Sequence, residues 1–283
     1  MKKKILILGG GISKERQISL ETAKQVKKAL KKKYKVLQSD LDKNFETKLK
    51  LFKPEIVFNA LHGRFGEDGY AQTILESNKI KYTHSGVLSS ALAMDKIVSK
   101  KIFKKNNLLT PKFIKFSNNL DVNKNLKKKI KKNLKFPVVL KPINEGSSVG
   151  VYISTEKNLK KNLIKLKKYK EIIIEEFING REIQVAILGK KKLGAIELKP
   201  KRKFYDYKAK YDLKSKTKHI IPANLTTKNL NKVLNIAFKA HKLLKCKGVT
   251  RSDFKFFRNK FYLLELNTQP GMTKLSLVPE IAE

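Results

Sequence analysis

The first forty residues alternate between apolar runs and a helical pattern, and this alternation constrains the fold more than any other feature. The run KILILGGG reads as a buried strand that ends in a glycine turn. Apolar residues then recur at roughly helical spacing from Ile18 to Leu30, and YKVLQSDL returns as a strand. Two strands joined by a helix form a βαβ unit. We therefore predict an α/β fold whose functional loops lie at the carboxyl ends of its strands.

The remaining patterns divide the chain into three units. Residues 1–88 fit a doubly wound, Rossmann-like domain with a parallel sheet, because PEIVFNALHG adds a strand and AQTILESNKIKYTHSG a helix and a short strand. Residues 89–178 fit an α+β unit with a helix, the strands FPVVLKP and GVYIS, a Lys-rich helix and the strand EIIIEEFI. Residues 179–283 contain two further strands, a long polar stretch, a helix at 228–245 and the hairpin RSDFKFFRNKFYLLELN.

The chain is strongly basic, with a net charge of +41 and a pI near 10.1. Such a charge first suggests a nucleic-acid or membrane-surface partner. Only six of the 65 basic residues are Arg, however, and phosphate and base recognition relies on the bidentate Arg fork. Lys is spread along the whole chain, and its densest run, residues 126–135, is most simply a solvated helix face. We expect no nucleic-acid partner, with a Lys-rich nucleic-acid-binding protein as the alternative from another class.

The cellular compartment follows from three features. The single cysteine, Cys246, rules out an internal disulfide and fits a reducing compartment. The apolar run at the N-terminus is too short before its glycines to be the core of a signal peptide. No window approaches the ~20 apolar residues that a membrane span needs. We therefore expect a cytoplasmic protein without a membrane partner.

The glycine turn Gly9–Gly11 does not carry the dinucleotide fingerprint. Counting Gly-x-Gly-x-x-Gly from Gly9 puts Lys14 in the last position, so NAD or FAD binding is not expected. The turn does place Glu15 in the first turn of a helix at the mouth of the sheet. Taken alone, Glu15 is most simply a carboxylate that interacts favourably with the helix dipole.

Two glycine-rich loops carry further candidates. The segment LHGRFGEDG places His62 between a buried strand and three glycines, where a catalytic role and a structural role are about equally expected. The segment KPINEGSSVGV, residues 141–151, packs a lysine, two glycines and two serines between apolar runs. In isolation it fits a solvated turn or a phosphate-binding loop about equally well.

The hairpin near the C-terminus brings hard oxygen ligands together. Arg251 and Asp253 share one face of a strand by period two, as do Glu265 and Asn267. A turn centred on Asn259 would set Asp253 opposite Glu265. Facing carboxylates repel unless a cation lies between them, and such oxygens suit Mg²⁺ held together with substrate phosphates. A register slipped by one residue would spoil this pairing, and the alternative is an exposed polar face.

Two further segments complete a nucleotide site. The polar segment 199–218 is too long for an ordinary loop, and its three tyrosines favour a lid over disorder. The run EIIIEEFI fits an adenine slot whose apolar side chains sandwich the ring, although alone it is a buried strand with an acidic end. Together with the glycine–serine loop and the hairpin, these features indicate an enzyme that uses a nucleoside triphosphate.

Six segments then appear in order over residues 4–281: GGGISKERQISL, ALHGRFGEDG, KPINEGSSVGV, FYDYKAKY, RSDF and LLELNTQPGMTKLSLVPE. This set resembles the D-alanine–D-alanine ligase family of the ATP-grasp superfamily. The resemblance implies an ATP-grasp fold, in which residues 89–178 and 179–283 are the central and C-terminal subdomains. It also implies ATP-dependent, ADP-forming ligation of two D-alanines through a D-alanyl phosphate, for peptidoglycan precursors. ATP and two Mg²⁺ (or Mn²⁺) ions would be the cofactors, and the chain would form a homodimer.

The resemblance assigns the catalytic residues by position. Glu15 would bind the ammonium of the first D-alanine, and Ser147 and Tyr211 would form with it a hydrogen-bonded contact that latches the lid. His62 would lie near the carboxylate of the first D-alanine. Arg251 would stabilise the acyl phosphate and the tetrahedral intermediate.

The same resemblance assigns the nucleotide, metal and pocket residues. Those near the phosphates would be Lys96, Lys141, Ser148 and, on the lid against the γ-phosphate, Lys210. Those in the adenine and ribose region would be Glu175, Glu176, Phe177, Ile178 and Glu182, with Glu176 standing where a Lys is common. The metal ligands would be Asp253, Glu265 and Asn267, and the D-alanine pockets would be lined by Gly271, Ser276 and Leu277.

Two points qualify this assignment. Tyr211 favours an amine acceptor, because relatives that make D-alanyl-D-lactate depart from the family at this lid position; an ATP-grasp ligase for another small amino acid or hydroxy acid is the alternative. Family members usually continue past SLVPE with a further helix, whereas this sequence stops at Glu283. A truncated sequence is therefore one expectation.

Overall fold

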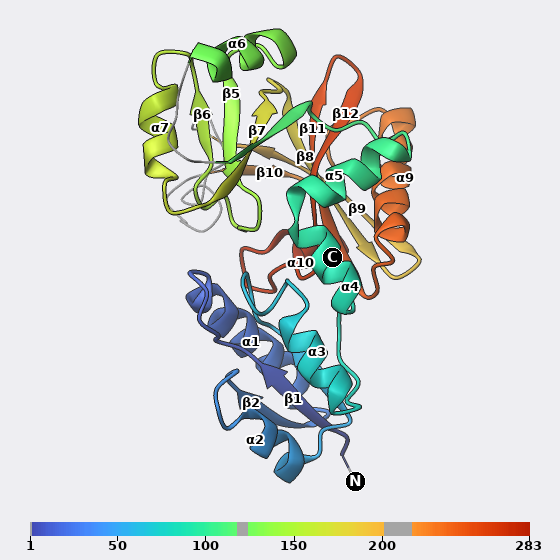
Figure 1. Ribbon diagram of the computed structural model, residues 1–283. Helices are drawn as coiled ribbons and strands as arrows, with labels where there is room; N and C mark the ends of the chain where they lie inside the picture. Colours follow the sequence, from blue (N-terminus) through green and yellow to red (C-terminus); the bar gives the residue numbers. More distant parts are fainter. Residues whose placement is uncertain (1, 118–123, 201–216) are drawn as a thin grey trace.

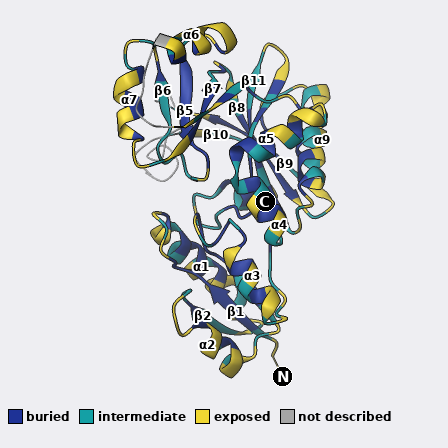
Figure 2. Cartoon of the chain, in the orientation of Figure 1, coloured by how far each residue is buried: buried dark blue, intermediate teal, exposed yellow. Residues whose placement is uncertain are grey.

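The computed structural model describes residues 2–117, 124–200 and 217–283. Three sheets follow one another along the chain, each with helices packed on it (Figure 1). The strands are largely buried, whereas exposed residues gather on the outward sides of the helices (Figure 2). The domain boundaries at residues 88 and 178 stay predictions. Within the described ranges, no helix combines the length and the hydropathy that a membrane crossing requires.

The first sheet is parallel, with the order β2-β1-β3. Its strands are β1 (Lys4–Leu8), β2 (Lys35–Ser39) and β3 (Ile56–Asn59), and its helices are α1 (Arg16–Leu30), α2 (Phe45–Phe52) and α3 (Tyr70–Ser77). Leu6 and Leu8 pack against α2 and α3, whereas Ile7 packs against α1. Helices therefore cover both faces, which confirms the predicted doubly wound arrangement. The helix α2 was not predicted, and the short strand expected after α3 is only an isolated bridge between Val57 and Tyr82.

The second sheet is antiparallel, with the order β4-β7-β5-β6. It consists of β4 (Phe113–Ser117), β5 (Val138–Pro142), β6 (Tyr152–Ser154) and β7 (Glu171–Glu176), packed with α6 (Lys124–Asn133) and α7 (Leu159–Lys165). The Lys-rich run 126–135 buries Leu126, Ile130 and Leu134 against this sheet and exposes most of its lysines, as predicted for a solvated helix face. The strand β4 was not predicted.

The third sheet is antiparallel, with the order β10-β9-β8-β11-β12. It consists of β8 (Arg181–Leu188), β9 (Lys191–Lys199), β10 (Lys218–Ile220), β11 (Val249–Phe257) and β12 (Lys260–Asn267), with α9 (Thr227–Leu243) on one face and α10 (Leu277–Ala282) on the other. The side of β11 that carries Arg251 and Asp253 is opposite to the side of Phe254, which packs in the core with α9. One side of β11 is therefore polar, with Arg251 and Asp253, and the other side packs in the hydrophobic core.

The single helix predicted at the start of residues 89–178 is two helices, α4 (Val87–Met94) and α5 (Lys96–Lys105). Asp95 separates them because its Oδ1 accepts hydrogen bonds from the backbone N–H groups of Ile97 (2.8 Å) and Val98 (2.9 Å), and so caps α5. Phe103 of α5 lies in the core of the third sheet, and Ile97 packs against the second sheet. The helix α5 therefore packs against both the second and the third sheet.

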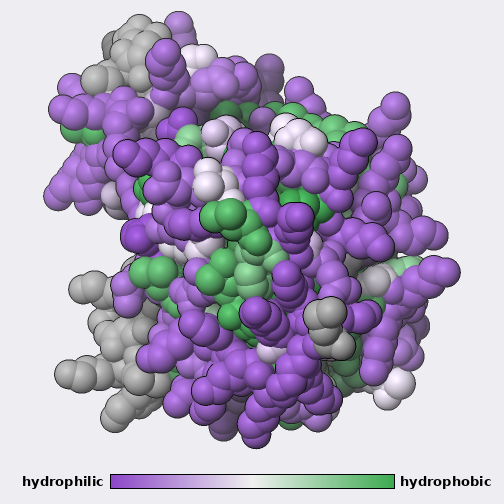
Figure 3. Space-filling view, turned by 90° about the horizontal axis from the view of Figure 1, so that it is seen from below, coloured by the Kyte–Doolittle hydropathy of each residue, from purple (hydrophilic) through white to green (hydrophobic). Residues whose placement is uncertain are grey.

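The surface is hydrophilic over most of the face seen from below, with hydrophobic residues gathered near its centre (Figure 3). Lysines are exposed on helices of all three sheet units, such as Lys24 on α1, Lys128 on α6 and Lys228 on α9. This spread agrees with the compositional interpretation of the high positive charge.

His84 makes the stability of the fold depend on pH in the mildly acidic range. The ring is buried, its Nδ1 lies 2.8 Å from Thr83 Oγ1, and it meets Phe58 edge-on. Burial, with a smaller contribution from repulsion by His62, lowers the pKa of His84 from 6.5 to about 4. Between these values the unfolded state binds more protons than the folded state, so the free energy of unfolding falls as the pH falls.

We therefore expect the free energy of unfolding to drop by up to about 3 kcal/mol between pH 6.5 and pH 4 through His84 alone. His84 has φ of 73°, which Asn tolerates well, so His84→Asn removes the titration without straining the backbone. Urea titrations across this range should show a shallower loss of stability for the variant than for the natural chain. Parallel pH curves for the two proteins would contradict this assignment.

Candidate active site

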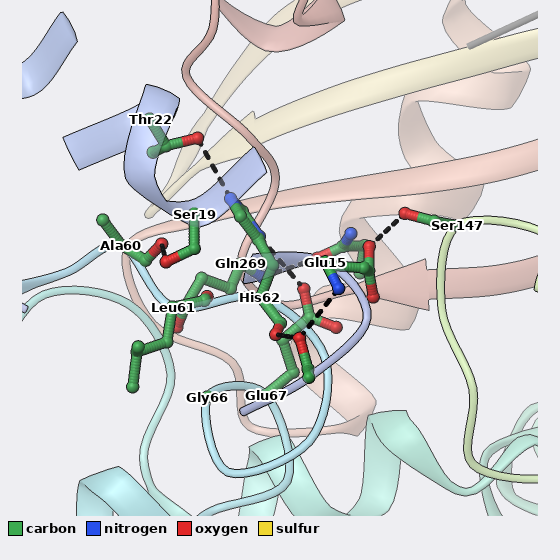
Figure 4. A network of polar contacts seen from close by, with 12 residues as sticks. Glu15, Ser19, Thr22, Ala60, Leu61, His62, Gly66, Glu67, Ser147 and Gln269 are labelled. Carbon is green, nitrogen blue, oxygen red and sulfur yellow. Dashed lines mark hydrogen bonds and ion pairs between the residues drawn. The ribbon is translucent and has the colours of Figure 1, made fainter. Parts of the chain in front are cut away.

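The turn after β1 positions Glu15. Asp40 holds this turn, since its Oδ1 accepts from the N–H of Gly11 (2.6 Å) and its Oδ2 from Arg16 Nη1 (2.6 Å). These hydrogen bonds lower the pKa of Asp40 against the opposing effect of burial. Glu15 follows as the N-cap of α1 and is buried, with its carboxylate directed toward Ser147 (Figure 4).

The glycine–serine loop 141–151 meets Glu15. Ser147 Oγ donates a hydrogen bond to Glu15 Oε1, and the two side chains point toward each other across the junction of two sheet units (Figure 4). A Cβ on Gly63 or on Gly146 would lie 2.9 Å from Glu15 Oε2, so a side chain at either position would displace the carboxylate from where it lies. The predicted contact between Glu15 and Ser147 is confirmed. Tyr211, its predicted third member, lies outside the described residues.

Two consecutive serines of this loop have an uncommon backbone conformation. Ser147 and Ser148 have φ of 48° and 60°, in the left-handed region that non-glycine residues rarely adopt. Each such residue costs on the order of 1–3 kcal/mol and is held by its surroundings, typically at a ligand site. The loop is therefore a formed structural feature rather than the simple solvated turn that the sequence left open.

His62 lies beside Glu15 in the loop after β3 and is nearly fully buried. Its Nε2 is 3.1 Å from Thr22 Oγ1 and its Nδ1 is 3.5 Å from Glu67 Oε1 (Figure 4). Two partners, one on each ring nitrogen, fix the orientation of the imidazole. The role predicted for His62 thus has a geometric basis, and Thr22 and Glu67 are positioning residues that the sequence analysis missed.

The loop after β12 is joined to the N-terminal unit by Gln269. Its Oε1 accepts from Asn59 Nδ2 (2.8 Å) and its Nε2 donates to the carbonyl of Leu61, across more than 200 residues of sequence (Figure 4). Gly271 follows at the same junction, where an added Cβ would lie 2.9 Å from Ser276 Oγ. The third and first sheet units therefore meet around one pocket.

That pocket contains most of the residues predicted to bind D-alanine. Its lining includes Glu15, His62, Glu67, Lys96, Gly146, Ser147, Arg251, Glu265, Asn267 and Gly271. Ser276 lies beside Gly271, where its Oγ accepts from the N–H of Thr273 (2.8 Å), but it is not among the lining residues. Leu277 is buried in the hydrophobic cluster under α10. The structure therefore brings Gly271 to the pocket and leaves Ser276 and Leu277 behind it.

A second pocket adjoins the first and encloses about 710 Å³ of empty space, including its opening to solvent. Its lining includes Lys96, Val139, Lys141, Ser148, Glu175, Glu176, Phe177, Ile178, Glu182, Asp253 and Glu265. Lys96 and Glu265 line both pockets, so a ligand in one lies next to a ligand in the other.

Lysines reach this second pocket from two directions. Lys96 Nζ donates to the carbonyl of Glu145 (2.6 Å) and lies 3.5 Å from Glu265 Oε2. Lys141 Nζ lies 2.7 Å from Glu175 Oε2. Burial disfavours the charged form of Lys141, but the attraction of Glu175 and Glu265 outweighs it and raises the pKa of Lys141. Lys210, predicted on the lid, lies outside the described residues.

Glu175 differs from the expectation for an adenine slot. The carboxylate is buried between two lysines, because Lys100 Nζ lies 3.0 Å from its second oxygen. Burial raises the pKa of Glu175, but the two lysines outweigh this effect and lower it. Phe177 and Ile178 add apolar surface to the pocket, and Lys255 Nζ donates to Glu182 Oε2 at 2.6 Å.

The hairpin formed by β11 and β12 has the predicted pairing. Asp253 is opposite Glu265, and Arg251 is opposite Asn267. Arg251 donates through Nε to Asp253 Oδ1 (2.7 Å) and through Nη2 to Oδ2 (3.1 Å), so it holds that carboxylate in a bidentate ion pair. The predicted turn centre is wrong, since Phe257 pairs with Lys260 around a two-residue turn at Arg258 and Asn259.

A β-bulge reconciles this turn with the pairing. The register shifts between Asp253 and Phe254, which leaves Leu264 as the extra residue of β12. Phe261 and Leu263 pack in the core with α9, and without the shift Glu265 would point into the same core. The bulge instead turns Glu265 and Asn267 toward the pockets.

The side-chain oxygens of Asp253, Glu265 and Asn267 fit a hard divalent cation. Two facing carboxylates repel unless a cation or cationic side chain lies between them, and the side-chain oxygen of Asn267 retains a second lone pair beyond its hydrogen bond from the N–H of Gln269 (2.7 Å). Carboxylate and amide oxygens beside a phosphate site are the donors that Mg²⁺ prefers. Asp253, Glu265 and Asn267 could therefore hold Mg²⁺.

Glu145 and Lys14 are further residues that the sequence analysis missed. Tyr169 donates to Glu145 Oε1 (2.8 Å), and Lys14 Nζ lies 3.5 Å from the same oxygen. Lys14 also donates to the hydroxyl of Tyr169 at 3.2 Å. These contacts join the glycine–serine loop to the start of α1, and no sequence pattern indicated a pairing across 130 residues.

The chain is similar in sequence and in overall structure to known proteins. The family profile described as "D-ala D-ala ligase C-terminus" matches residues 102–283. A D-alanine–D-alanine ligase of Pelagibacter ubique (strain HTCC1062) is 67% identical over 285 residues, covering 100% of this chain and 93% of that protein. A solved D-alanine–D-alanine ligase from Bacillus anthracis has a TM-score of 0.87 at 35% identity, and a structure of that enzyme complexed with ATP has 0.84 at 31%. The match to each of these structures covers 99% of this chain and 91% of the solved chain.

These similarities extend over the whole chain and include both its sequence and its architecture. They confirm the predicted α/β, ATP-grasp fold and give no support to the nucleic-acid-binding alternative. Identity of 67% over the full length is far above what unrelated chains of this size share. The chain therefore belongs to the D-alanine–D-alanine ligase family.

Proposed function

We propose that the protein is an ADP-forming ligase that uses ATP to join two D-alanine molecules into D-alanyl-D-alanine, a peptidoglycan precursor. One observation carries the proposal: a pocket lined by lysines and an apolar slot adjoins a pocket lined by Glu15, His62 and Arg251. Lys96 and Glu265 line both, so a phosphoryl donor and a carboxylate acceptor would lie side by side.

In the first step, a carboxylate oxygen of the first D-alanine attacks the γ-phosphorus of ATP. A bond from oxygen to phosphorus forms as the bond to ADP breaks. Because a carboxylate is a weak nucleophile, catalysis here is mostly positioning and charge neutralisation. Glu15 receives the substrate ammonium, His62 lies near its carboxylate, and Lys96 and Lys141 neutralise phosphate oxygens.

In the second step, the amine of the second D-alanine attacks the acyl carbon of the D-alanyl phosphate. The tetrahedral intermediate collapses as its bond to the phosphate oxygen breaks, which releases phosphate. Fixed donors must lie where the oxyanion charge develops, and Arg251, held in place by Asp253, supplies them. Gly271 leaves room for the second substrate.

The nucleotide and metal sites follow from the same lining. Phe177 and Ile178 sandwich the adenine, Glu182 binds the ribose, and the main chain of Glu175 and Glu176 reads the edge of the base. Ser148 lies beside the phosphates. Asp253, Glu265 and Asn267 would hold two Mg²⁺ (or Mn²⁺) ions, which when bound supply charge neutralisation for the phosphate oxygens.

Lys210 and Tyr211 belong to the proposed lid, and both lie outside the described residues, whereas the ends of the segment, Lys199 and Lys218, lie in β9 and β10. An acyl phosphate hydrolyses readily, so a closing element is required to exclude water. Tyr211 favours an amine as acceptor over a hydroxy acid. Ser276 and Leu277 would shape the D-alanine pockets from behind. A homodimer and a cytoplasmic location complete the proposal.

The proposal predicts that the purified protein releases phosphate from ATP only when D-alanine and Mg²⁺ are both present. L-alanine should give little release, because Glu15 and His62 fix the ammonium and the carboxylate and leave only one place for the methyl group. D-lactate as acceptor should give little D-alanyl-D-lactate. A continuous phosphate assay with a folded preparation measures each case, and phosphate release that is independent of D-alanine would contradict the proposal.

A further inference from the structure

Lys100 is a buried cation that no step of the reaction uses. It lies on α5 one helical turn after Lys96, on the side that packs against the second sheet. Its side chain is 0% exposed, and it is absent from the lining of the nucleotide pocket. A lysine held entirely away from water requires a counter-charge. The question is what this counter-charge does.

The counter-charge is the carboxylate of Glu175, which Lys100 shares with Lys141. Lys100 Nζ lies 3.0 Å from Oε1, and Lys141 Nζ lies 2.7 Å from Oε2. The contact of Lys100 is ionic, without the direction of a good hydrogen bond. The carboxylate thus lies between a lysine in the core and a lysine on the wall of the nucleotide pocket.

The charges of this triad decide what the pocket presents to a nucleotide. Lys141 and Glu175 alone would form a neutral, closed pair, in which the ammonium is directed at its own carboxylate. With Lys100 the triad has a net positive charge, and Lys141 and Glu175 are the two members that line the pocket. The other charged groups that act on the triad, Glu265 and Glu182, are both negative and also line this pocket.

We propose that Lys100 is a positioning residue for the nucleotide site: it neutralises Glu175 from the core side, so that the Lys141–Glu175 pair presents a net positive charge to the phosphates of ATP. The inference rests on the proposed use of ATP at this pocket. Lys100 itself touches no substrate.

The test is a cycle of variants at Lys100 and Glu175, with ADP binding measured by calorimetry. Lys100→Met should weaken ADP binding about tenfold, as expected when one charge-assisted contact to phosphate is lost. The KM for D-alanine should stay unchanged. Lys101→Met, at the exposed neighbouring position of α5, is the matched control and should bind ADP as the natural chain does.

The second-site variant separates electrostatics from packing. In Lys100→Met/Glu175→Gln the uncompensated carboxylate is removed together with its partner, so Lys141 again carries a net charge. ADP affinity should return to within about threefold of the natural chain, whereas a merely structural role of Lys100 predicts no recovery. Because Lys100→Met leaves Glu175 half compensated and can destabilise the fold, the double variant carries the test if the single variant unfolds.

Two results would overturn the inference: natural ADP affinity in a folded Lys100→Met protein, or a double variant that binds ADP as weakly as the single one. Failure of the proposed ligase function would look different. In that case the natural chain would bind ADP, and the cycle would behave as described, but D-alanine would not stimulate phosphate release. Calorimetry with ADP alone therefore reports on Lys100 independently of ligation.

Discussion

Replacing Glu265 with Gln is expected to reduce turnover by roughly a thousandfold or more while the fold persists. Glu265 faces Asp253 across the hairpin, lines both pockets and lies 3.5 Å from Lys96 Nζ. A cation site at developing phosphate charge contributes several kcal/mol, and each 1.36 kcal/mol is a factor of ten in rate. Gln keeps the size of the side chain and removes its charge, so the rate loss tests the charge.

The Glu265→Gln measurement is steady-state phosphate release over a titration of Mg²⁺, with circular dichroism to verify folding. If Glu265 is a metal ligand, the variant should require more Mg²⁺ for its residual activity. Glu156→Gln is the matched control, because Glu156 forms only a surface ion pair with Lys131 at 2.8 Å. Near-natural activity of Glu265→Gln would show that the facing carboxylates do not form the metal site.

Replacing Arg251 with Lys is expected to lower kcat by about 10²- to 10³-fold, the effect typical of losing a fixed oxyanion donor. The guanidinium is mostly buried and is held by two hydrogen bonds to Asp253. Lys keeps the positive charge but cannot reproduce this bidentate geometry. Because Arg251 lines the D-alanine pocket rather than the nucleotide pocket, the KM for ATP should change little.

Two comparisons sharpen the Arg251 prediction. Arg258→Lys, at the exposed turn of the same hairpin, should leave kcat unchanged. If Arg251 served only to orient Asp253 for the metal, raised Mg²⁺ would restore the activity of Arg251→Lys. A kcat that stays low at saturating Mg²⁺ supports a direct role at the intermediate, whereas a raised KM for ATP with natural kcat would contradict it.

The hairpin illustrates how far sequence reasoning reaches. Period two and a turn near Asn259 predicted that Asp253 faces Glu265, and the structure has this pairing. The turn itself consists of Arg258 and Asn259, both with positive φ. With a two-residue turn at this place and no irregularity in the strands, Asp253 would lie opposite Leu264. A one-residue bulge corrects the register. Bulges depend on packing against the neighbouring layer, here the core under α9, and that packing has no signature in a single strand.

Other missed features share one physical cause, which is separation along the chain. Gln269 bonds to Asn59 and Leu61, Glu145 meets Lys14, and Lys100 meets Glu175. Each pair lies on different sheet units or on a helix and a distant strand, so no local periodicity relates its members. By contrast, the strand–turn–helix start and the loop residues Glu15 and His62 were predicted, because glycine turns and apolar runs are local signals.

The break between α4 and α5 has a different cause. The sequence pattern predicted one helix here, but the side chain of Asp95 accepts hydrogen bonds from two backbone N–H groups, and a new helix begins after it. The consequence is functional, because the new helix aims Lys96 and Lys100 at the nucleotide pocket and its supporting triad. In the sequence, the only local sign of this break is Asp95 itself, because Asp is a preferred N-cap residue.

In the proposed reaction a D-alanine carboxylate becomes an acyl phosphate, a mixed anhydride, before the peptide bond forms. With D-alanine labelled by ¹⁸O in its carboxylate, each turnover should place one labelled oxygen in the released phosphate, because the carboxylate oxygen that attacks ATP leaves with phosphorus. Mass spectrometry of the phosphate and the dipeptide from one reaction measures this directly. Equal amounts of labelled phosphate and D-alanyl-D-alanine are the predicted result, and unlabelled phosphate, or no phosphate that depends on D-alanine, would contradict it.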